Sequence, residues 1–287
     1  MYNTLIDCEI LKQHIEDPGW KIVDCRFTLA DPGRGQRDYE QGHIPNAVYA
    51  HLDIHMSVPQ DPGVTGRHPL PTVEVASACF STLGIATGQQ VVAYDDAGGA
   101  SAAVRLWWML RWLGHQAVAV LDGGWQGWLA RGYPTRSGEE TIALTRFEPK
   151  VHPELLVEVN ELERLLHEPD WRVFDARSFE RYQGLNETID PVAGHIPGAY
   201  SAPYSENLGT DGRFRPRPEL QQRYLDLLGG LPANKAVFYC GSGVTAIHDI
   251  LAMEYAGLPG ARLYAGSWSE WIADPRRPVA ESGKPGS

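Results

Sequence analysis

Cysteine is scarce in this sequence and forms no pattern typical of a metal or disulfide site. The 287 residues include four cysteines and ten histidines, with no CxxC pair and no HExxH stretch. Zinc sites and disulfide frameworks depend on closely spaced or paired ligands. We therefore expect no metal, no structural disulfide and no bound cofactor.

Positive charge and long apolar runs are also lacking. Lys and Arg total 25 against 36 Asp and Glu, which gives a net charge of -11. Nucleic-acid binding needs a basic patch, so we expect no nucleic-acid partner, and an anionic substrate must be met by local donors. No apolar run approaches the roughly 18 residues of a membrane helix, and residues 1–4 lack a charged and apolar signal region. The sequence thus predicts no membrane partner and a cytoplasmic location, where thiols stay reduced.

What the sequence does contain is an internal duplication with a period of about 150 residues. The matching pairs are residues 20–26 with 171–177, 42–47 with 194–199, 92–95 with 237–240, and 123–128 with 266–271. This period is far too long for a solenoid repeat and indicates two copies of one domain. We predict a first domain at residues 1–136, a linker at 137–153 and a second domain at 154–287.

Helical patterns alternate with short apolar strands in the first half. Helices are expected near residues 8–16, 73–83, 101–113 and 125–131, and strands near 20–24, 47–51, 90–94 and 117–121. Such alternation predicts an α/β fold in which each domain has a parallel sheet flanked by helices on both faces.

Cys240 stands at the end of one of the apolar runs in the second half. Residues 236–239 are apolar, the loop 241–245 contains two glycines, and a helical pattern then continues to about Tyr255. This order predicts a strand, a short loop and a helix. Backbone N–H groups and the helix dipole meet at such a point, where they favour a thiolate and an anionic ligand. We therefore predict that Cys240 is a nucleophile.

The other cysteines lack a glycine-rich loop after them. Cys8, Cys25 and Cys79 are interpreted as small buried hydrophobic residues. The first copy has Asp95 at the position of Cys240, and a carboxylate cannot perform thiol chemistry. Only the second copy should be catalytic.

With these motifs together, the chain resembles the two-domain rhodanese family of sulfurtransferases. The resemblance rests on the tandem halves, the paired Gly-His-Ile-Pro segments at residues 42–45 and 194–197, and the loop that begins at Cys240. It implies two tandem rhodanese-like domains. Within the family, the loop is similar to that of 3-mercaptopyruvate sulfurtransferases, whereas members that use thiosulfate typically have basic residues where this chain has Gly241 and Ser242.

The resemblance implies a reaction in two halves. Cys240 takes a sulfur atom from 3-mercaptopyruvate, pyruvate leaves, and a thiol or cyanide then accepts the sulfur from the Cys240 persulfide. Mercaptopyruvate carries one carboxylate and needs N–H and hydroxyl donors at its carbonyl, whereas the thiosulfate dianion benefits from cations. Ser242 is expected to assist catalysis, and the loop as a whole is expected to bind the donor, through Gly241, Ser242, Gly243, Val244 and Thr245.

Two further residues are assigned by the resemblance. Arg181 matches the arginine that binds the donor carboxylate. His68 resembles a histidine that reaches the loop serine and could relay a proton. The chain departs from the family at Thr188, where mercaptopyruvate enzymes often carry a second arginine. His43 and His195 occur in both copies, so we interpret them as structural.

The sequence is also compatible with a second function, that of a thiosulfate sulfurtransferase. A third function, that of a non-catalytic rhodanese-like binding module, fits the first half better than the second. A cysteine phosphatase would need an arginine six residues after the nucleophile to hold phosphate, and that position is Ala246.

Overall fold

The structure, a computed structural model, describes residues 1–281 and contains two compact units. Unit 1 comprises residues 1–58, 70–153 and 210–214, and unit 2 comprises residues 59–69, 154–209 and those from 215 onward. The segment 59–69 therefore belongs to unit 2, although it precedes most of unit 1 in the sequence.

Unit 1 contains a five-stranded parallel sheet with the order β1-β5-β4-β2-β3. Its strands are β1 (Leu5–Ile6), β2 (Trp20–Asp24), β3 (Ala47–Tyr49), β4 (Gln90–Tyr94) and β5 (Val118–Leu121). Its helices are α1 (Cys8–His14), α2 (Arg34–Gln41), α3 (Leu52–His55), α4 (Val73–Thr82), α5 (Ala102–Trp112) and α6 (Gly124–Ala130).

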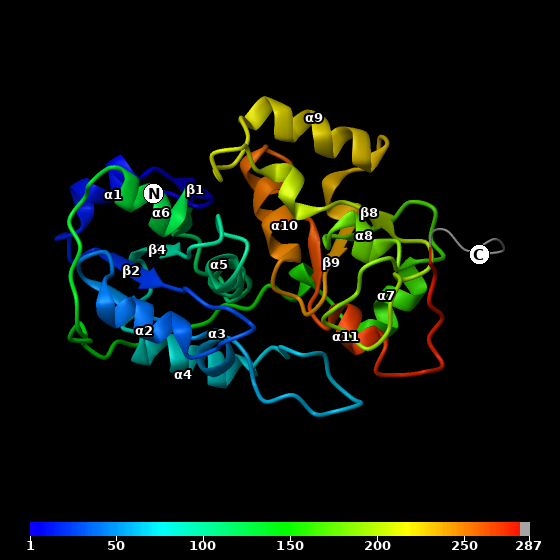
Figure 1. Cartoon of the computed structure of the whole chain (residues 1–287), viewed down its shortest axis with the longest axis horizontal. Helices are drawn as coiled ribbons and strands as arrows, with labels where there is room; N and C mark the ends of the chain where they lie inside the picture. The colour runs from blue at the N-terminus through cyan, green and yellow to red at the C-terminus, as the bar shows by residue number, and fades with distance from the viewer. Residues whose placement is uncertain (282–287) are drawn as a thin grey trace. The chain divides into compact units, whose positions relative to one another are not determined.

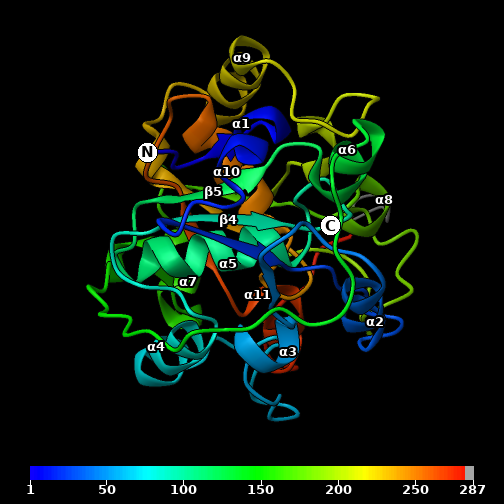
Figure 2. The same cartoon turned by 90° about the vertical axis from the view of Figure 1, so that its left-hand side faces the viewer.

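Helices cover both faces of this sheet. Figure 2 shows α1 and α6 on one side of β4 and β5, with α5 on the other. Leu11 of α1 and Trp128 of α6 are fully buried against Val92 of β4 and Ala119 of β5. Because both faces are covered, β4 and β5 are buried along their whole length, which explains why β5 is entirely apolar and β4 is apolar after Gln90.

Unit 2 repeats this architecture, with the strand order β6-β10-β9-β7-β8 and parallel pairing throughout. Its strands are β6 (Leu156–Val157), β7 (Arg172–Asp175), β8 (Tyr200–Ser201), β9 (Ala236–Tyr239) and β10 (Arg262–Tyr264). Its α-helices are α7 (Val159–Leu165), α8 (Phe179–Tyr182), α9 (Arg217–Leu228), α10 (Ala246–Tyr255) and α11 (Ser267–Trp271). Three 3-10 helices are η1 (Pro153–Leu155), η2 (Tyr204–Asn207) and η3 (Ala233–Lys235).

In unit 2 the central strand β9 lies between α10 on one side and α7 on the other (Figure 1). Trp268 and Trp271 of α11 pack with Leu162 of α7 against the α7 side of the sheet. The predicted α/β fold with flanked parallel sheets is confirmed in both units. The sequence patterns did not predict the two-residue strand β1 or the polar helix α2, because neither has a clear apolar period.

A buried ion pair occurs at the same place in each sheet. Arg26 pairs with Asp24 after β2, and Arg177 pairs with Asp175 after β7, with a shortest N···O distance of 2.6 Å in both units. Each guanidinium also donates to the carbonyl of the glycine that begins the Gly-His-Ile-Pro segment, at 2.6 Å. The repeated sequence motif is thus a repeated structural device that attaches this segment to the sheet.

Candidate active site

Cys240 is the first residue after β9, at the carboxyl end of the sheet of unit 2. It is buried, with 3% of its surface exposed. Its N–H donates to Oγ of Ser267 at 3.1 Å, and its carbonyl accepts from the N–H of Trp268 at 3.0 Å. The main chain of Cys240 is therefore held between the end of β9 and the start of α11.

The loop after Cys240 lies against the chain near Ala265, and this contact requires glycine. Gly243 has a φ of +74°, and a Cβ atom there would lie 2.0 Å from the carbonyl oxygen of Ala265. No other residue type fits this conformation and this space without moving the main chain.

Several backbone N–H groups of the loop are available to a ligand. Those of Gly241, Ser242, Val244 and Thr245 donate no hydrogen bond to any described residue. All of these residues except Thr245 are buried. Thr245 precedes the first residue of α10, and its side chain makes no capping hydrogen bond. A buried loop at a helix N-terminus with available N–H groups is suited to an anion.

Ser242 and His68 contact each other within unit 2. The distance between Oγ of Ser242 and Nδ1 of His68 is 2.8 Å, and both side chains are buried. His68 is brought there by the segment 59–69, because the N–H of Arg67 donates to Oγ of Ser269 at 3.0 Å. Gly66 permits this approach, since a Cβ atom at Gly66 would lie 2.4 Å from the carbonyl oxygen of Gly266.

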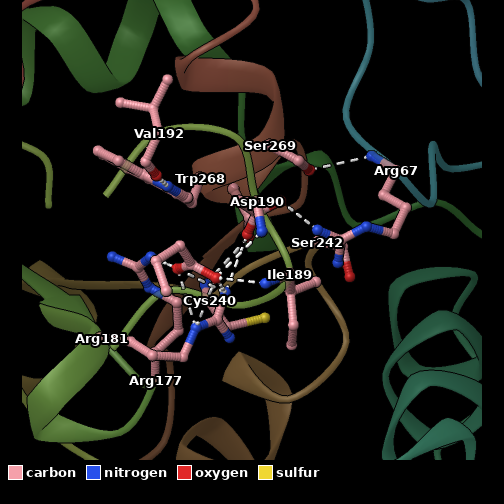
Figure 3. A network of polar contacts seen from close by, with 12 residues as sticks. Arg67, Arg177, Arg181, Ile189, Asp190, Val192, Cys240, Ser242, Trp268 and Ser269 are labelled. Carbon is pink, nitrogen blue, oxygen red and sulfur yellow. Dashed lines mark hydrogen bonds and ion pairs between the residues drawn. The ribbon is translucent and has the colours of Figure 1, made fainter. Parts of the chain in front are cut away.

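Arg181 belongs to the short helix α8 and is placed beside the loop by two carboxylates. Its Nε donates to Glu187 at 3.0 Å, and its Nη2 donates to Asp190 at 2.9 Å. A methyl group at Gly241 would lie 3.7 Å from Nη2 of Arg181. The second oxygen of Asp190 accepts from Nη2 of Arg67, whose Nη1 would lie 3.7 Å from the same methyl group. Figure 3 shows both arginines converging on Asp190 near Cys240.

Glu187 completes this polar network. Burial alone would raise the pKa of Glu187, but the N–H groups of Asp190 and Ile189 together with Arg181 hold it below its ordinary value. Glu187 also lies 3.3 Å from Nη1 of Arg177. The carboxylate is therefore ionised and stabilises the positions of both guanidinium groups.

The sequence analysis missed three of these residues, Arg67, Glu187 and Asp190. Arg67 directly precedes His68, and the two carboxylates lie between Arg181 and the second Gly-His-Ile-Pro segment. Their nearness to candidate residues was the available signal, but no sequence pattern distinguishes a charged loop residue in a network from one in solvent. Thr188 lies between the two carboxylates in this loop.

The equivalent loop in unit 1 is occupied by its own side chain. Asp95 follows β4 as Cys240 follows β9, and its carboxylate is fully buried. It accepts hydrogen bonds from four backbone N–H groups, namely those of Ala97 at 2.9 Å, Gly99 at 2.8 Å, Ser101 at 3.1 Å and Ala103 at 3.4 Å. The carboxylate of Asp95 thus takes the backbone N–H groups that an anionic ligand would need in this loop.

The remaining cysteines are Cys8 and Cys25, which are buried, and Cys79, which is partly buried. Burial raises the pKa of Cys8, Cys25 and Cys79, most strongly for Cys25, where the carboxylates of Asp24 and Asp95 add to the effect. These thiols stay protonated at neutral pH and are poor nucleophiles.

His43 and His195 make the same kind of contact in the two units. Nδ1 of each ring contacts the carbonyl of a tyrosine, Tyr39 at 2.8 Å and Tyr182 at 2.7 Å.

Within residues 1–281, no group of three or more His, Cys, Asp or Glu side chains could hold a metal ion. In the same range no helix is both long and apolar enough to cross a membrane.

The family model described as "Rhodanese-like domain" matches residues 7–131 and 158–274. The chain belongs to the rhodanese family. A protein from Pseudomonas aeruginosa, named "Probable 3-mercaptopyruvate sulfurtransferase", is 47% identical over 277 residues, which cover 96% of this chain and 97% of that protein. A protein from Arabidopsis thaliana, named "Thiosulfate/3-mercaptopyruvate sulfurtransferase 1, mitochondrial", is 30% identical over 96% of this chain and 77% of its own length.

A solved structure shares the fold. The 3-mercaptopyruvate sulfurtransferase from Leishmania major superposes with a TM-score of 0.83 at 32% identity and covers 94% of this chain and 74% of that one. The resemblance of the sequence to two-domain rhodaneses is confirmed.

Proposed function

We propose that this chain is a sulfurtransferase that moves a sulfur atom from 3-mercaptopyruvate to a thiol or to cyanide through a persulfide on Cys240. The observation that carries the proposal is the contrast between two equivalent loops. The loop after β9 combines a cysteine with backbone N–H groups that have no partner among the described residues, whereas Asp95 occupies the loop after β4. The names of the relatives support the same chemistry.

In the first half-reaction the Cys240 thiolate attacks the sulfur of the donor. The new bond joins the two sulfur atoms, the carbon–sulfur bond of mercaptopyruvate breaks, and its electron pair goes to the departing carbon as the enolate of pyruvate. Negative charge then develops on the oxygen of that enolate. The hydroxyl of Ser242, together with the loop N–H groups, is suited to donate hydrogen bonds to this oxygen.

His68 acts through Ser242 in this proposal. A proton relayed from His68 through the Ser242 hydroxyl would convert the enolate into neutral enol, which becomes pyruvate after protonation at carbon. The 2.8 Å contact between Nδ1 of His68 and Oγ of Ser242 supports this role.

In the second half-reaction the acceptor attacks the outer sulfur of the persulfide. The sulfur–sulfur bond breaks and its electron pair returns to Cys240 as thiolate. Cyanide yields thiocyanate, and a thiolate yields its own persulfide. The reaction uses small molecules on both sides and needs no bound cofactor.

Arg181 is proposed to bind the donor carboxylate. Its Nε and Nη2 are used by Glu187 and Asp190, while Nη1 makes no hydrogen bond to the described residues. The guanidinium is therefore held in place, and its Nη1 group remains available to donate hydrogen bonds to a substrate. Gly241 leaves space beside it, because the loop has no side chain at this position.

We further propose that catalysis is confined to the second copy of the domain, at residues 154–287. Residues 1–136 form the non-catalytic copy, and residues 137–153 connect them. Two segments depart from these bounds: residues 59–69 are part of unit 2 and contribute His68, and residues 210–214 are part of unit 1.

Thiosulfate remains the second candidate donor. Two arginines lie beside Gly241, and the name of the Arabidopsis thaliana relative includes thiosulfate. The deciding experiment measures kcat/KM for 3-mercaptopyruvate and for thiosulfate on one preparation, with cyanide as the acceptor and thiocyanate as the product. A higher value for 3-mercaptopyruvate is expected. Activity with neither donor would overturn the proposed function.

A further inference from the structure

A single buried carboxylate holds both arginines that lie beside the catalytic loop. The side chain of Asp190 is 3% exposed, one of its oxygens accepts from Arg67, and the other accepts from Arg181 at 2.9 Å. The two guanidinium groups are 21% and 18% exposed. Asp190 therefore occupies the place between two cations that an anionic ligand would otherwise take.

The charged groups around this carboxylate balance one another. Besides Arg67 and Arg181, the network contains Arg177, which pairs with Glu187 at 3.3 Å and with Asp175. The cations are Arg67, Arg177 and Arg181, and the anions are Asp175, Glu187 and Asp190. With equal numbers of guanidinium and carboxylate groups, the network adds no net positive charge to the loop after Cys240.

We propose that Asp190 determines the donor preference of this protein by cancelling one of the two cationic charges beside Gly241. The inference rests on the proposed function, and it assigns a role to a residue that does not itself react. A donor with one carboxylate meets hydrogen-bond donors from Arg67, Arg181 and the loop. A dianion meets the same donors without the net positive charge that it needs.

Coulomb's law predicts which donor gains more when the charge of Asp190 is removed. Removing the charge of Asp190 makes the site more positive by one unit, and this change stabilises a dianion twice as strongly as a monoanion. The site is partly desolvated, so salt screens the effect only in part. Donors of both kinds gain, but thiosulfate gains more.

The test compares kcat/KM for thiosulfate with that for 3-mercaptopyruvate in the wild-type protein, in Asp190→Asn and in Asp190→Glu. Asp190→Asn keeps the shape of the side chain. If thiosulfate gains about tenfold and the monoanionic donor about threefold, the ratio should rise about threefold in favour of thiosulfate, mainly through a lower KM for thiosulfate. Asp190→Glu keeps the charge, and its ratio should stay near that of the wild type.

Asp170→Asn is the matched control. Asp170 is an exposed carboxylate of unit 2 that pairs with Lys235 at 2.8 Å, and it precedes β7, at the opposite end of the sheet from Cys240. This variant makes the same change in net charge, and its donor ratio should equal that of the wild type. Circular dichroism and thermal melting of each variant check that the fold is retained.

A binding measurement separates the inference from turnover. Thiosulfate is titrated into Cys240→Ser and into Cys240→Ser with Asp190→Asn, and the double variant should bind it about tenfold more tightly. An unchanged affinity and an unchanged donor ratio in Asp190→Asn would overturn the inference while leaving the proposed function intact. An equal shift in Asp190→Glu or in Asp170→Asn would also overturn it. A wild-type protein inactive with both donors would instead refute the proposed function.

Discussion

Replacement of Arg181 by alanine tests how the donor carboxylate is bound. The structure limits the size of the effect, because Glu187 and Asp190 use Nε and Nη2 and leave Nη1 for the substrate. One charge-assisted hydrogen bond at a site that is 18% exposed contributes about 2 kcal/mol, which corresponds to roughly a 30-fold loss in kcat/KM. The loss should appear mostly as a higher KM for 3-mercaptopyruvate.

The two half-reactions distinguish this role from a structural one. Pyruvate has left before the acceptor binds, so transfer from preformed persulfide to cyanide should be little affected by Arg181→Ala. Stopped-flow measurement of each half-reaction provides the assay, and Arg181→Lys should recover part of the loss, since lysine supplies a charge without the planar fork. Arg276→Ala, at a guanidinium of unit 2 that is 88% exposed, is the control. Equal slowing of both half-reactions, or of neither, would refute the assignment of Arg181.

Ser242→Ala should lower kcat roughly 10- to 100-fold in the donor half-reaction, measured by pyruvate release, because the hydroxyl that meets the enolate oxygen is lost. Gly243→Ala should lower the melting temperature and the activity strongly, whereas Gly257→Ala, with a φ of +84° but nothing within 4 Å of the new Cβ, should cost only about 1 kcal/mol; similar losses in both would contradict the role of the Ala265 contact. Burial raises the pKa of Asp249 to about 7, with Arg223 4.0 Å away and Tyr224 donating a hydrogen bond. In the unfolded state this carboxyl ionises near pH 4, so the stability contributed by its protonated folded form is complete below about pH 4 and is lost as pH rises to about 7. In thermal denaturation, Asp249→Asn should match wild type only below about pH 4, and its advantage should grow by about 1.4 kcal/mol for each pH unit up to about pH 7.

The fold could be predicted largely from the sequence because its elements are strongly patterned. β9 is an unbroken apolar run and β4 is apolar after Gln90, and parallel strands buried on both faces have this composition. Because the domain is duplicated, most elements occur twice in the sequence, and the loop after β9 can be compared directly with the loop after β4. The nucleophile position and its inactive counterpart at Asp95 followed from that comparison.

The surroundings of Cys240 were less accessible to sequence reasoning. The segment 59–69 has no helix or strand, and its place in unit 2 depends on close main-chain contacts such as that of Gly66 with Gly266. Arg67 and Asp190 are 123 residues apart, and nothing in the local sequence predicts their ion pair. The sequence analysis predicted one arginine for the donor carboxylate, Arg181, whereas the structure places a second guanidinium, that of Arg67, beside the loop as well. The cytoplasmic location and the thiol or cyanide acceptor stay predictions.

Mass spectrometry of the protein after incubation with 3-mercaptopyruvate and no acceptor tests whether Cys240 carries the transferred sulfur. We expect the peptide containing Cys240 to gain the mass of one sulfur atom and cyanide to remove this mass, whereas Cys240→Ser should neither gain it nor turn over. Sulfur on a peptide containing Cys25 or Cys79 instead, or near-normal turnover by Cys240→Ser, would contradict the proposed mechanism.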